Sequence, residues 1–202
     1  MKVICIGRNY RDHALELDNP VPEAPVFFLK PESSLLQKNR PFFYPDFSQD
    51  IHYELELVIR INKVGKHISR KYAPAYYNEL ALGIDFTARD LQRECKEKGL
   101  PWEIAKAFDW SAPISRFVPL KERSPGQIHF QLLKNGQKVQ DDKASGMIFS
   151  FEELISYVSK YMTLKTGDLI FTGTPSGVGP VKIGDRLEAY LNDEKMMWCD
   201  IR

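Results

Sequence analysis

The sequence predicts an α+β protein that is mostly β, a β-sandwich or roll with a few short helices. Strand character recurs in segments bounded by Gly, Pro or Asn-Gly, at residues 2–7, 25–31, 52–61, 79–86, 127–139, 167–174 and 184–191. Long helices do not alternate with these segments, which argues against a doubly wound sheet. With 202 residues, 43% of them hydrophobic and 12% aromatic, the chain can bury one substantial core, so a single domain over residues 1–202 is expected.

The first expected helix lies close to the N-terminus. Asn9 is a candidate N-cap, with Asp12 three positions later. This helix would place His13 and Glu16 one turn apart on the same side. The surrounding residues 10–24 mix polar and apolar types, so we expect this segment to be mobile.

Two further helices are expected later in the chain. One begins after the apolar run that ends at Asp85, can be capped by Thr87 and stops at Gly99. The other begins with a capping box of Ser150 and Glu153, and an apolar stripe follows it. The stripe indicates that this last helix packs against the core.

A β-hairpin is expected around Asn135-Gly136. A type I′ turn needs positive φ at both central residues, and Asn and Gly adopt such angles readily. The flanking stretches, QIHFQLLK and QKVQ, would then pair as antiparallel strands.

Charge and hydropathy limit the classes of partner. Lys and Arg total 28 against 27 for Asp and Glu, a net charge of +1, so neither nucleic acid nor an anionic membrane is expected as a partner. Cys5, Cys95 and Cys199 lack CxxC spacing, which indicates neither a disulfide framework nor a zinc site. The first apolar run is too short for a signal peptide, and no run approaches the ~20 apolar residues of a membrane span. We therefore expect a cytoplasmic protein.

The stretch HYELELVIRI, residues 52–61, carries two glutamates on one side of an expected strand. Side chains alternate along a strand, so Glu54 and Glu56 share a face roughly 7 Å apart, given a rise of about 3.3 Å per residue. Taken alone, this pattern is typical of a half-exposed strand with its polar face in water. The other interpretation is a metal site, which requires a third ligand.

Asp85 supplies a third carboxylate from an apolar run. A buried unpaired charge is costly, so Asp85 must pair with Arg89 one turn later, cap the following helix or bind a metal ion. Three carboxylates without His or Cys favour Mg²⁺ or Mn²⁺, with Ca²⁺ a weaker candidate. An anionic substrate would need further cations beside this site, for which Lys106, in a strand-like stretch, and Arg8 are candidates.

Four stretches, in this order, resemble the fumarylacetoacetate hydrolase family, specifically its short single-domain acylpyruvase and oxaloacetate decarboxylase branch. They are GRNYRDHALEL, HYELELVIRI, GIDFTARDLQRECKEKGLPWEIAKAF and TGTPSGVGPVKIGD, and the similarity covers nearly the whole chain. The resemblance implies a mixed β-sandwich roll, a homodimer, and Mg²⁺ or Mn²⁺ held by Glu54, Glu56 and Asp85.

The resemblance also assigns roles to residues outside the triad of carboxylates. The catalytic residues would be His13, Glu16 and Lys106, and the substrate-binding residues would be Arg8, Gln92 and Thr174. In the family, the His-Glu dyad lies on a lid that orders when substrate binds, and the residue matching Gln92 helps to fix the closed lid. The sequence departs from the family at Gly146, where many relatives carry a small polar or acidic residue, so no hydrogen bond is expected there.

The expected reaction is cleavage of a C–C bond in small 2-oxo acids. An ion that chelates the carboxylate and 2-oxo oxygens would stabilise the enolate that forms when the bond breaks. For 3-acylpyruvates such as acetylpyruvate and fumarylpyruvate, His13 and Glu16 would activate the attacking water, whereas oxaloacetate decarboxylation needs no water. Oxaloacetate keto-enol tautomerisation and 2-hydroxyhepta-2,4-diene-1,7-dioate isomerisation on the same site stay open. A non-catalytic β module that binds metal is an alternative of another class, but it gives no use to Lys106 or the dyad.

Three other features have no firm role in the sequence. TGTPSGVG lacks the ending of a phosphate loop, so we expect a turn whose backbone N–H groups face a substrate carboxylate. The stretch KEKG is expected to be a solvated helix end. Lys30 either lies near the site or simply precedes a turn.

Overall fold

The computed structural model of the protein describes residues 1–16, 20–120 and 125–202. Residues 17–19, part of the segment expected to be mobile, lie outside the described part. The described α-helices are short, namely α1 (Arg11–Glu16), α2 (Arg89–Lys98), α3 (Glu103–Lys106) and α4 (Phe151–Tyr161). The 3-10 helices are η1 (Glu32–Ser34), η2 (Arg70–Tyr76), η3 (Pro125–Gln127) and η4 (Ala144–Gly146). Among these described elements, no helix is long and apolar enough to cross a membrane.

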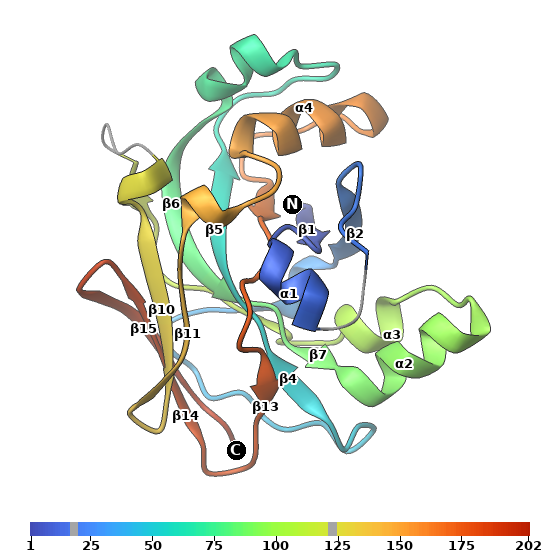
Figure 1. Cartoon of the computed structure of the whole chain (residues 1–202), viewed down its shortest axis with the longest axis vertical. Helices are drawn as coiled ribbons and strands as arrows, with labels where there is room; N and C mark the ends of the chain where they lie inside the picture. The colour runs from blue at the N-terminus through green and yellow to red at the C-terminus, as the bar shows by residue number, and fades with distance from the viewer. Residues whose placement is uncertain (17–19, 121–124) are drawn as a thin grey trace.

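The strands form two larger and two smaller sheets in the described part of the chain (Figure 1). The central sheet has the order β2 (Val26–Lys30), β1 (Val3–Gly7), β12 (Leu169–Phe171), β5 (Leu55–Ile61), β6 (Tyr77–Ile84) and β9 (Val118–Pro119). The second sheet has the order β11 (Gln137–Lys143), β10 (His129–Lys134), β14 (Arg186–Leu191) and β15 (Glu194–Asp200). The smaller sheets are β13 (Gly179–Pro180), β4 (Ile51–Tyr53) and β7 (Thr87–Ala88), and β3 (Leu35–Leu36) with β8 (Ala112–Pro113). Because β1 and β12 are parallel while β5 and β6 are antiparallel, the central sheet is mixed. The predicted mostly β, α+β sandwich roll is therefore confirmed.

Both faces of the central sheet are covered by apolar side chains. On one face, residues such as Leu55 and Leu57 join a large buried cluster with the second sheet and α4. On the other face, Val58 and Phe171 belong to a smaller buried cluster. The expectation of a half-exposed strand is therefore wrong for β5, because a second layer of side chains covers the face that carries the glutamates.

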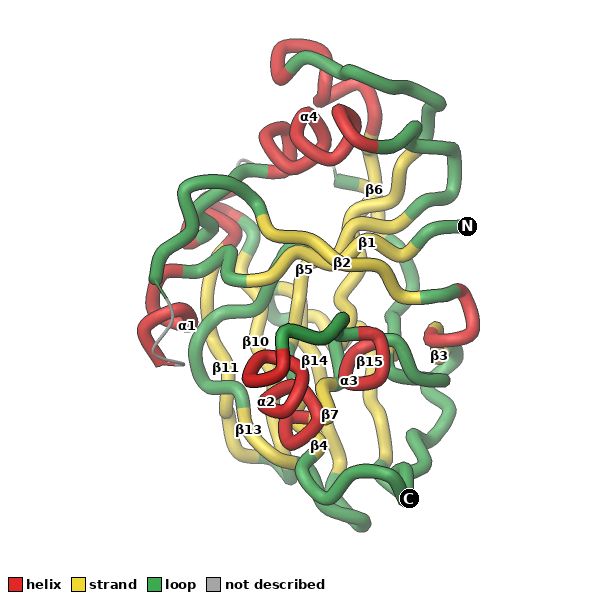
Figure 2. Tube along the Cα trace, turned by 90° about the vertical axis from the view of Figure 1, so that its right-hand side faces the viewer, coloured by secondary structure: helices red, strands yellow, loops and turns green. Residues whose placement is uncertain are grey.

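The helices occupy separate places around the sheets. Figure 2 shows α4 at one end of the molecule, with α2 and α3 packed together some way from it. The capping box of α4 is confirmed, since the Ser150 side chain accepts from the Glu153 N–H and the Glu153 side chain accepts from the Ser150 N–H. Gly99 ends α2 in the left-handed conformation, as predicted, with φ of 63°.

Two predicted helix caps are wrong. Ala88 is the N-cap of α2 and makes no side-chain hydrogen bond, while Thr87 lies in β7. Asn9 does not cap α1, because its side chain joins two other segments, donating to the Thr172 carbonyl at 2.7 Å and accepting from the Phe149 N–H at 2.8 Å. In both cases a distant partner takes the side chain that a local helix end could have used.

The predicted hairpin is confirmed between β10 and β11. Asn135 and Gly136 have φ of 53° and 80°, the positive values that a type I′ turn needs. The three cysteines are also as expected, since Cys5, Cys95 and Cys199 are free and buried.

Candidate active site

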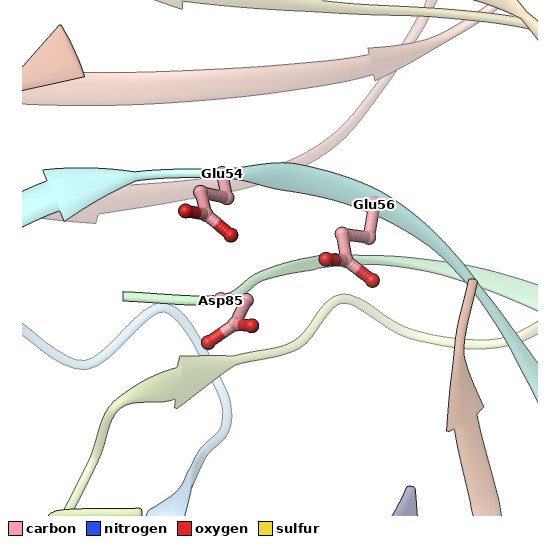
Figure 3. A group of neighbouring side chains, drawn as sticks. All are labelled: Glu54, Glu56 and Asp85. Carbon is pink, nitrogen blue, oxygen red and sulfur yellow. The ribbon is translucent and has the colours of Figure 1, made fainter. Parts of the chain in front are cut away.

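Three carboxylates meet at the end of the β5–β6 pair. The pairing of Leu55 with Ile84 sets Glu54 beside Asp85, whose N–H donates to the Glu54 carbonyl at 2.8 Å. Glu56 lies two residues further along the same face. One carboxylate oxygen from each residue lies within 4.8 Å of the others, and the side chains point toward one another (Figure 3). The sequence therefore identified a group that the sheet register brings together.

This carboxylate triad, Glu54, Glu56 and Asp85, is buried. The exposed fractions of the three residues are 5%, 1% and 1%, so none of them lies on a wet strand surface. Three clustered carboxylates cannot all be ionised in such a place without positive charge nearby. The structure supplies that charge from three other elements.

Lys106 is the first of these cations. Its Nζ lies 2.9 Å from Glu54 Oε2 and 2.8 Å from Asp85 Oδ2, and it also donates to Thr87 Oγ1. Lys106 ends the helix α3, so the expected strand-like setting is wrong, although its place in the site is as expected. Burial would lower the pKa of Lys106, but Asp85 and Glu54 raise it overall, so the ammonium stays charged.

Lys30, which had no firm role in the sequence, belongs to the same cluster. It projects from β2, and its Nζ lies 2.8 Å from Asp85 Oδ1. The ammonium also donates to Ser111 Oγ at 2.8 Å and to the Lys106 carbonyl. Lys30 therefore connects the Asp85 carboxylate to the end of α3.

Arg89 is the third cation, and it binds a different carboxylate from the one anticipated. Its guanidinium donates to Glu54 Oε1 at 2.5 Å and not to Asp85. A second guanidinium nitrogen donates to Gln92 Oε1 at 2.6 Å. The alternative in which Asp85 pairs with Arg89 is wrong. The role of Arg89 was missed because sequence spacing does not show which of two nearby carboxylates an arginine reaches.

The electrostatics of the triad suit a divalent cation. Burial alone would raise the pKa of Glu54, but Lys106 and Arg89 hold it below its ordinary value. Burial, and then the charges of Asp85 and Glu54, raise the pKa of Glu56 well above its ordinary value. Asp85 Oδ1 is buried and lies 2.8 Å from the Lys30 ammonium. This buried, all-oxygen donor set fits Mg²⁺ or Mn²⁺, which would compete with Lys106 and Lys30 for these oxygens.

The His13 and Glu16 side chains form the expected dyad on α1. His13 Nδ1 lies 3.3 Å from Glu16 Oε2, and His13 is only 5% exposed. Burial lowers the pKa of His13 despite the nearby carboxylates Glu54 and Glu16. The imidazole is therefore neutral at pH 7 and can accept a proton.

The glycine-rich stretch binds protein carboxylates. Gly177 N–H donates to Glu16 at 3.1 and 3.2 Å, and Gly173 N–H donates to Glu56 Oε2 at 2.7 Å. These two N–H groups therefore bind protein carboxylates, and the expectation that the turn faces a substrate carboxylate stays a prediction for its other N–H groups. Gly177 has φ of 93°, and a Cβ there would meet the Val139 carbonyl at 2.1 Å, so the close approach requires glycine.

One pocket collects the predicted residues. Arg8, His13, Gln92, Lys106 and Thr174 all line it together with the triad, while Glu16 contacts it through His13. The aromatic and basic side chains of this pocket that the sequence missed are Phe28, Arg89, Lys96 and Trp102. Aromatic and basic residues occur throughout this sequence, so only the fold shows that these four line the pocket.

Gly146 lies outside this pocket. A Cβ at Gly146 would lie 2.8 Å from Asp142 Oδ1 and 3.2 Å from the Tyr10 ring. Close packing therefore accounts for the glycine, and no side-chain hydrogen bond to the site is possible there.

The chain is similar to known proteins over most of its length. Residues 2–200 match the family described as Fumarylacetoacetate (FAA) hydrolase C-terminal. The mitochondrial oxaloacetate tautomerase FAHD1 of Bos taurus is 47% identical over 192 residues, covering 94% of this chain and 86% of that protein. The mitochondrial oxaloacetate decarboxylase of Dictyostelium discoideum is also 47% identical over 192 residues, covering 94% and 88%.

A solved structure has the same fold. The crystal structure of fumarylpyruvate hydrolase from Pseudomonas aeruginosa, in complex with Mn²⁺ and pyruvate, superposes with a TM-score of 0.93 at 37% identity. The match covers 100% of this chain and 89% of that chain. Family, fold and site geometry agree, and the chain belongs to the fumarylacetoacetate hydrolase family.

Proposed function

We propose that the protein is an Mg²⁺- or Mn²⁺-dependent enzyme that cleaves C–C bonds in small 2-oxo acids. It hydrolyses 3-acylpyruvates to pyruvate and a carboxylic acid, and it decarboxylates oxaloacetate. The observation that carries this proposal is that the carboxylate triad and the buried His13 line one pocket. The names of the relatives, which include an oxaloacetate decarboxylase and a fumarylpyruvate hydrolase, support the same chemistry.

Glu54, Glu56 and Asp85 would hold the ion. When bound, it supplies Lewis-acid polarisation of the carboxylate and 2-oxo oxygens of a substrate. Lys106 and Arg89 keep Glu54 ionised, and the Lys30 ammonium lies 2.8 Å from Asp85 Oδ1. The chain thus maintains negative charge on Glu54, in a place where burial alone would favour a protonated acid.

His13 is the proposed base for hydrolysis. A carboxylate can only accept, so the contact with Glu16 places the imidazole proton on Nδ1 and leaves Nε2 free to take a proton from water. Gly177 N–H in turn orients Glu16. Arg8 and Thr174, in the same pocket, are the proposed partners of the substrate's carboxylate groups.

Oxaloacetate tautomerisation is a second candidate, favoured by the name of the bovine relative. It needs proton transfer at C3 only, for which His13 is also placed. A substrate panel separates the reactions: acetylpyruvate, fumarylpyruvate and oxaloacetate, each with and without Mn²⁺, followed by pyruvate release and by the loss of enol absorbance. Pyruvate release from an acylpyruvate supports the proposal, whereas enol–keto exchange with no pyruvate from any substrate contradicts it.

A non-catalytic metal module is tested by thermal unfolding. Oxalate, a dianion that resembles an enolate, should raise the melting temperature only when Mg²⁺ or Mn²⁺ is present. A structural metal site would respond to the ion alone, with no further rise on adding oxalate.

We also propose the assembly and location expected from the sequence. These are a homodimer, a single catalytic domain over residues 1–202 and a cytoplasmic protein. Sedimentation equilibrium tests the dimer, and a sedimenting mass near 23.3 kDa, that of one chain, would contradict it.

A further inference from the structure

Two cations at the outer end of the active-site pocket lack acidic partners. Arg8 follows β1 with φ of 60°, and Lys96 projects from α2; both line the pocket that contains the triad. Within the described part of the chain, neither side chain forms an ion pair. In contrast, the inner cations Lys30, Lys106 and Arg89 each contact a triad carboxylate. The positive charges of Arg8 and Lys96 are therefore available to an anionic ligand.

The two outer cations also affect each other. Burial lowers the pKa of Lys96, and the charges of Arg8 and then Arg89 lower it further. Like charges held close together repel, and an anion placed between them relieves that repulsion. The end of the KEKG stretch behaves as expected at Lys98, which pairs with Glu94 Oε1 at 2.7 Å, but Lys96 turns toward the pocket.

Two aromatic rings lie between Lys106, an inner cation, and Lys96, an outer one. Lys106 Nζ lies 5.2 Å from the centre of the Phe28 ring, and the Phe28 and Trp102 ring centres are 5.9 Å apart. Lys96 Nζ lies 5.9 Å from the centre of the Trp102 ring. The pocket wall thus runs from the carboxylate triad, across an aromatic surface, to a positive end. This order of surfaces matches a ligand with an anionic group at each end and a short carbon spacer between them.

We infer that Lys96, with Arg8, forms a subsite for the distal carboxylate of a 2-oxo dicarboxylate. The inference rests on the proposed function, which places the 2-oxo end of the substrate at the triad. The spacer would then lie along Phe28 and Trp102, and the second carboxylate would reach the Lys96 ammonium. Lys96 would distinguish dianionic substrates from monoanionic ones of the same length, and so determine specificity within the 2-oxo acids.

Binding of matched probes to the Mn²⁺-loaded protein tests this subsite. The probes are 2-oxoglutarate and 2-oxoadipate, each compared by calorimetry with the monoanion of equal length, 2-oxopentanoate and 2-oxohexanoate. Wild-type protein should prefer at least one dianion by about tenfold or more, the size expected for a hydrogen bond between charged groups. Lys96→Met keeps the stem and removes the charge, so this preference should be lost, while Lys96→Arg should retain it.

Lys98→Met is the matched control. It removes a charge from the same helix but outside the pocket, so the dianion preference should stay at the wild-type value. An unchanged preference in Lys96→Met at both chain lengths overturns the subsite and leaves the proposed function standing. Equal weakening of dianion and monoanion also overturns it, since Lys96 would then only shape the pocket. If wild-type protein binds none of the four probes, the proposed function fails together with the subsite.

Discussion

The carboxylates Glu54 and Glu16 would raise the pKa of His13, but burial has the larger effect and lowers it, so the imidazole is neutral. Such a group can take a proton from water near pH 7. His13→Ala should therefore lower kcat for acetylpyruvate hydrolysis by about 10²–10⁴-fold. Decarboxylation of oxaloacetate, which needs no activated water, should fall much less.

His52→Ala is a fitting control for this prediction. His52 also contacts a carboxylate, Asp50 at 2.9 Å, but it lies outside the pocket that holds the triad. Hydrolysis by this variant should stay near the wild-type rate. Unimpaired hydrolysis in His13→Ala would show that another group activates the water.

Gln140 is a buried side chain that links the strand segment of Glu54 and Glu56 to the stretch that carries Thr174. Its Oε1 accepts from Leu55 N–H at 2.9 Å, between Glu54 and Glu56, the two glutamates proposed as metal ligands. Its Nε2 donates to Thr174 Oγ1 at 2.8 Å and to the Pro175 carbonyl at 3.0 Å. Leu55 N–H can only donate, which fixes the amide orientation, and both amide protons are used. The Thr174 hydroxyl is consequently an acceptor toward Gln140, and its own proton is free for a substrate oxygen.

Gln140→Glu should disturb this arrangement without removing the Leu55 contact. A carboxylate oxygen would take the Thr174 proton and face the Pro175 carbonyl, so Thr174 could no longer donate to substrate. We expect KM for acetylpyruvate to rise about tenfold or more, with a smaller change in kcat. Gln137→Glu, an exposed change in the same hairpin, should leave KM unaltered. A fall in kcat with unchanged KM would contradict the role assigned to Gln140.

At the scale of elements, a buried turn clamps the two parallel strands β1 and β12. Asp168 is 1% exposed and accepts from the N–H groups of Lys2 and Lys165, each at 2.8 Å, while it also pairs with the Lys2 ammonium. Burial would raise the pKa of Asp168, but these donors lower it below its ordinary value. Its contribution to stability is therefore complete above the ordinary pKa of Asp and is lost as the pH falls through the lowered pKa.

Asp168→Asn should lower the free energy of unfolding by roughly 1–3 kcal/mol at pH 7. Denaturant unfolding at pH 7 and at pH 3 measures the effect, and the difference from wild type should shrink at the lower pH. Asp185→Asn alters the other Gly-Asp turn, where the aspartate is half-buried and accepts from Lys182 N–H at 2.9 Å. The free energy of unfolding should fall less in this control than in Asp168→Asn. A larger fall in the free energy of unfolding for Asp185→Asn would contradict the greater importance assigned to the Asp168 turn.

The elements show what the sequence could predict. Period-two alternation placed Glu54 and Glu56 on one face, but a pattern within one strand does not show what covers that face. The capping box of α4 was predictable because both partners are local. The caps proposed for Asn9 and Thr87 failed because each side chain binds a group far away in sequence, at Phe149 and Lys106.

At the scale of the whole molecule, the site is built from segments that span most of the chain. Side chains or N–H groups come from α1, β2, β5, α2 and α3, and from the segments that follow β6 and β12. The triad and dyad were predictable because their acids and histidine stand out in apolar or motif-bearing stretches. Lys30 and Lys96 were not, since only the fold shows that one lysine contacts Asp85 and the other lines the pocket.

We propose above that the buried carboxylates hold a catalytic divalent ion. The most direct measurement is pyruvate release from acetylpyruvate by protein stripped with EDTA, before and after Mn²⁺ is restored. We expect release to fall to background on stripping and to recover with Mn²⁺ in wild type, but not in Asp85→Asn, which weakens one ligand of the triad. Pyruvate release that persists undiminished in EDTA would show that the reaction does not depend on a bound divalent ion.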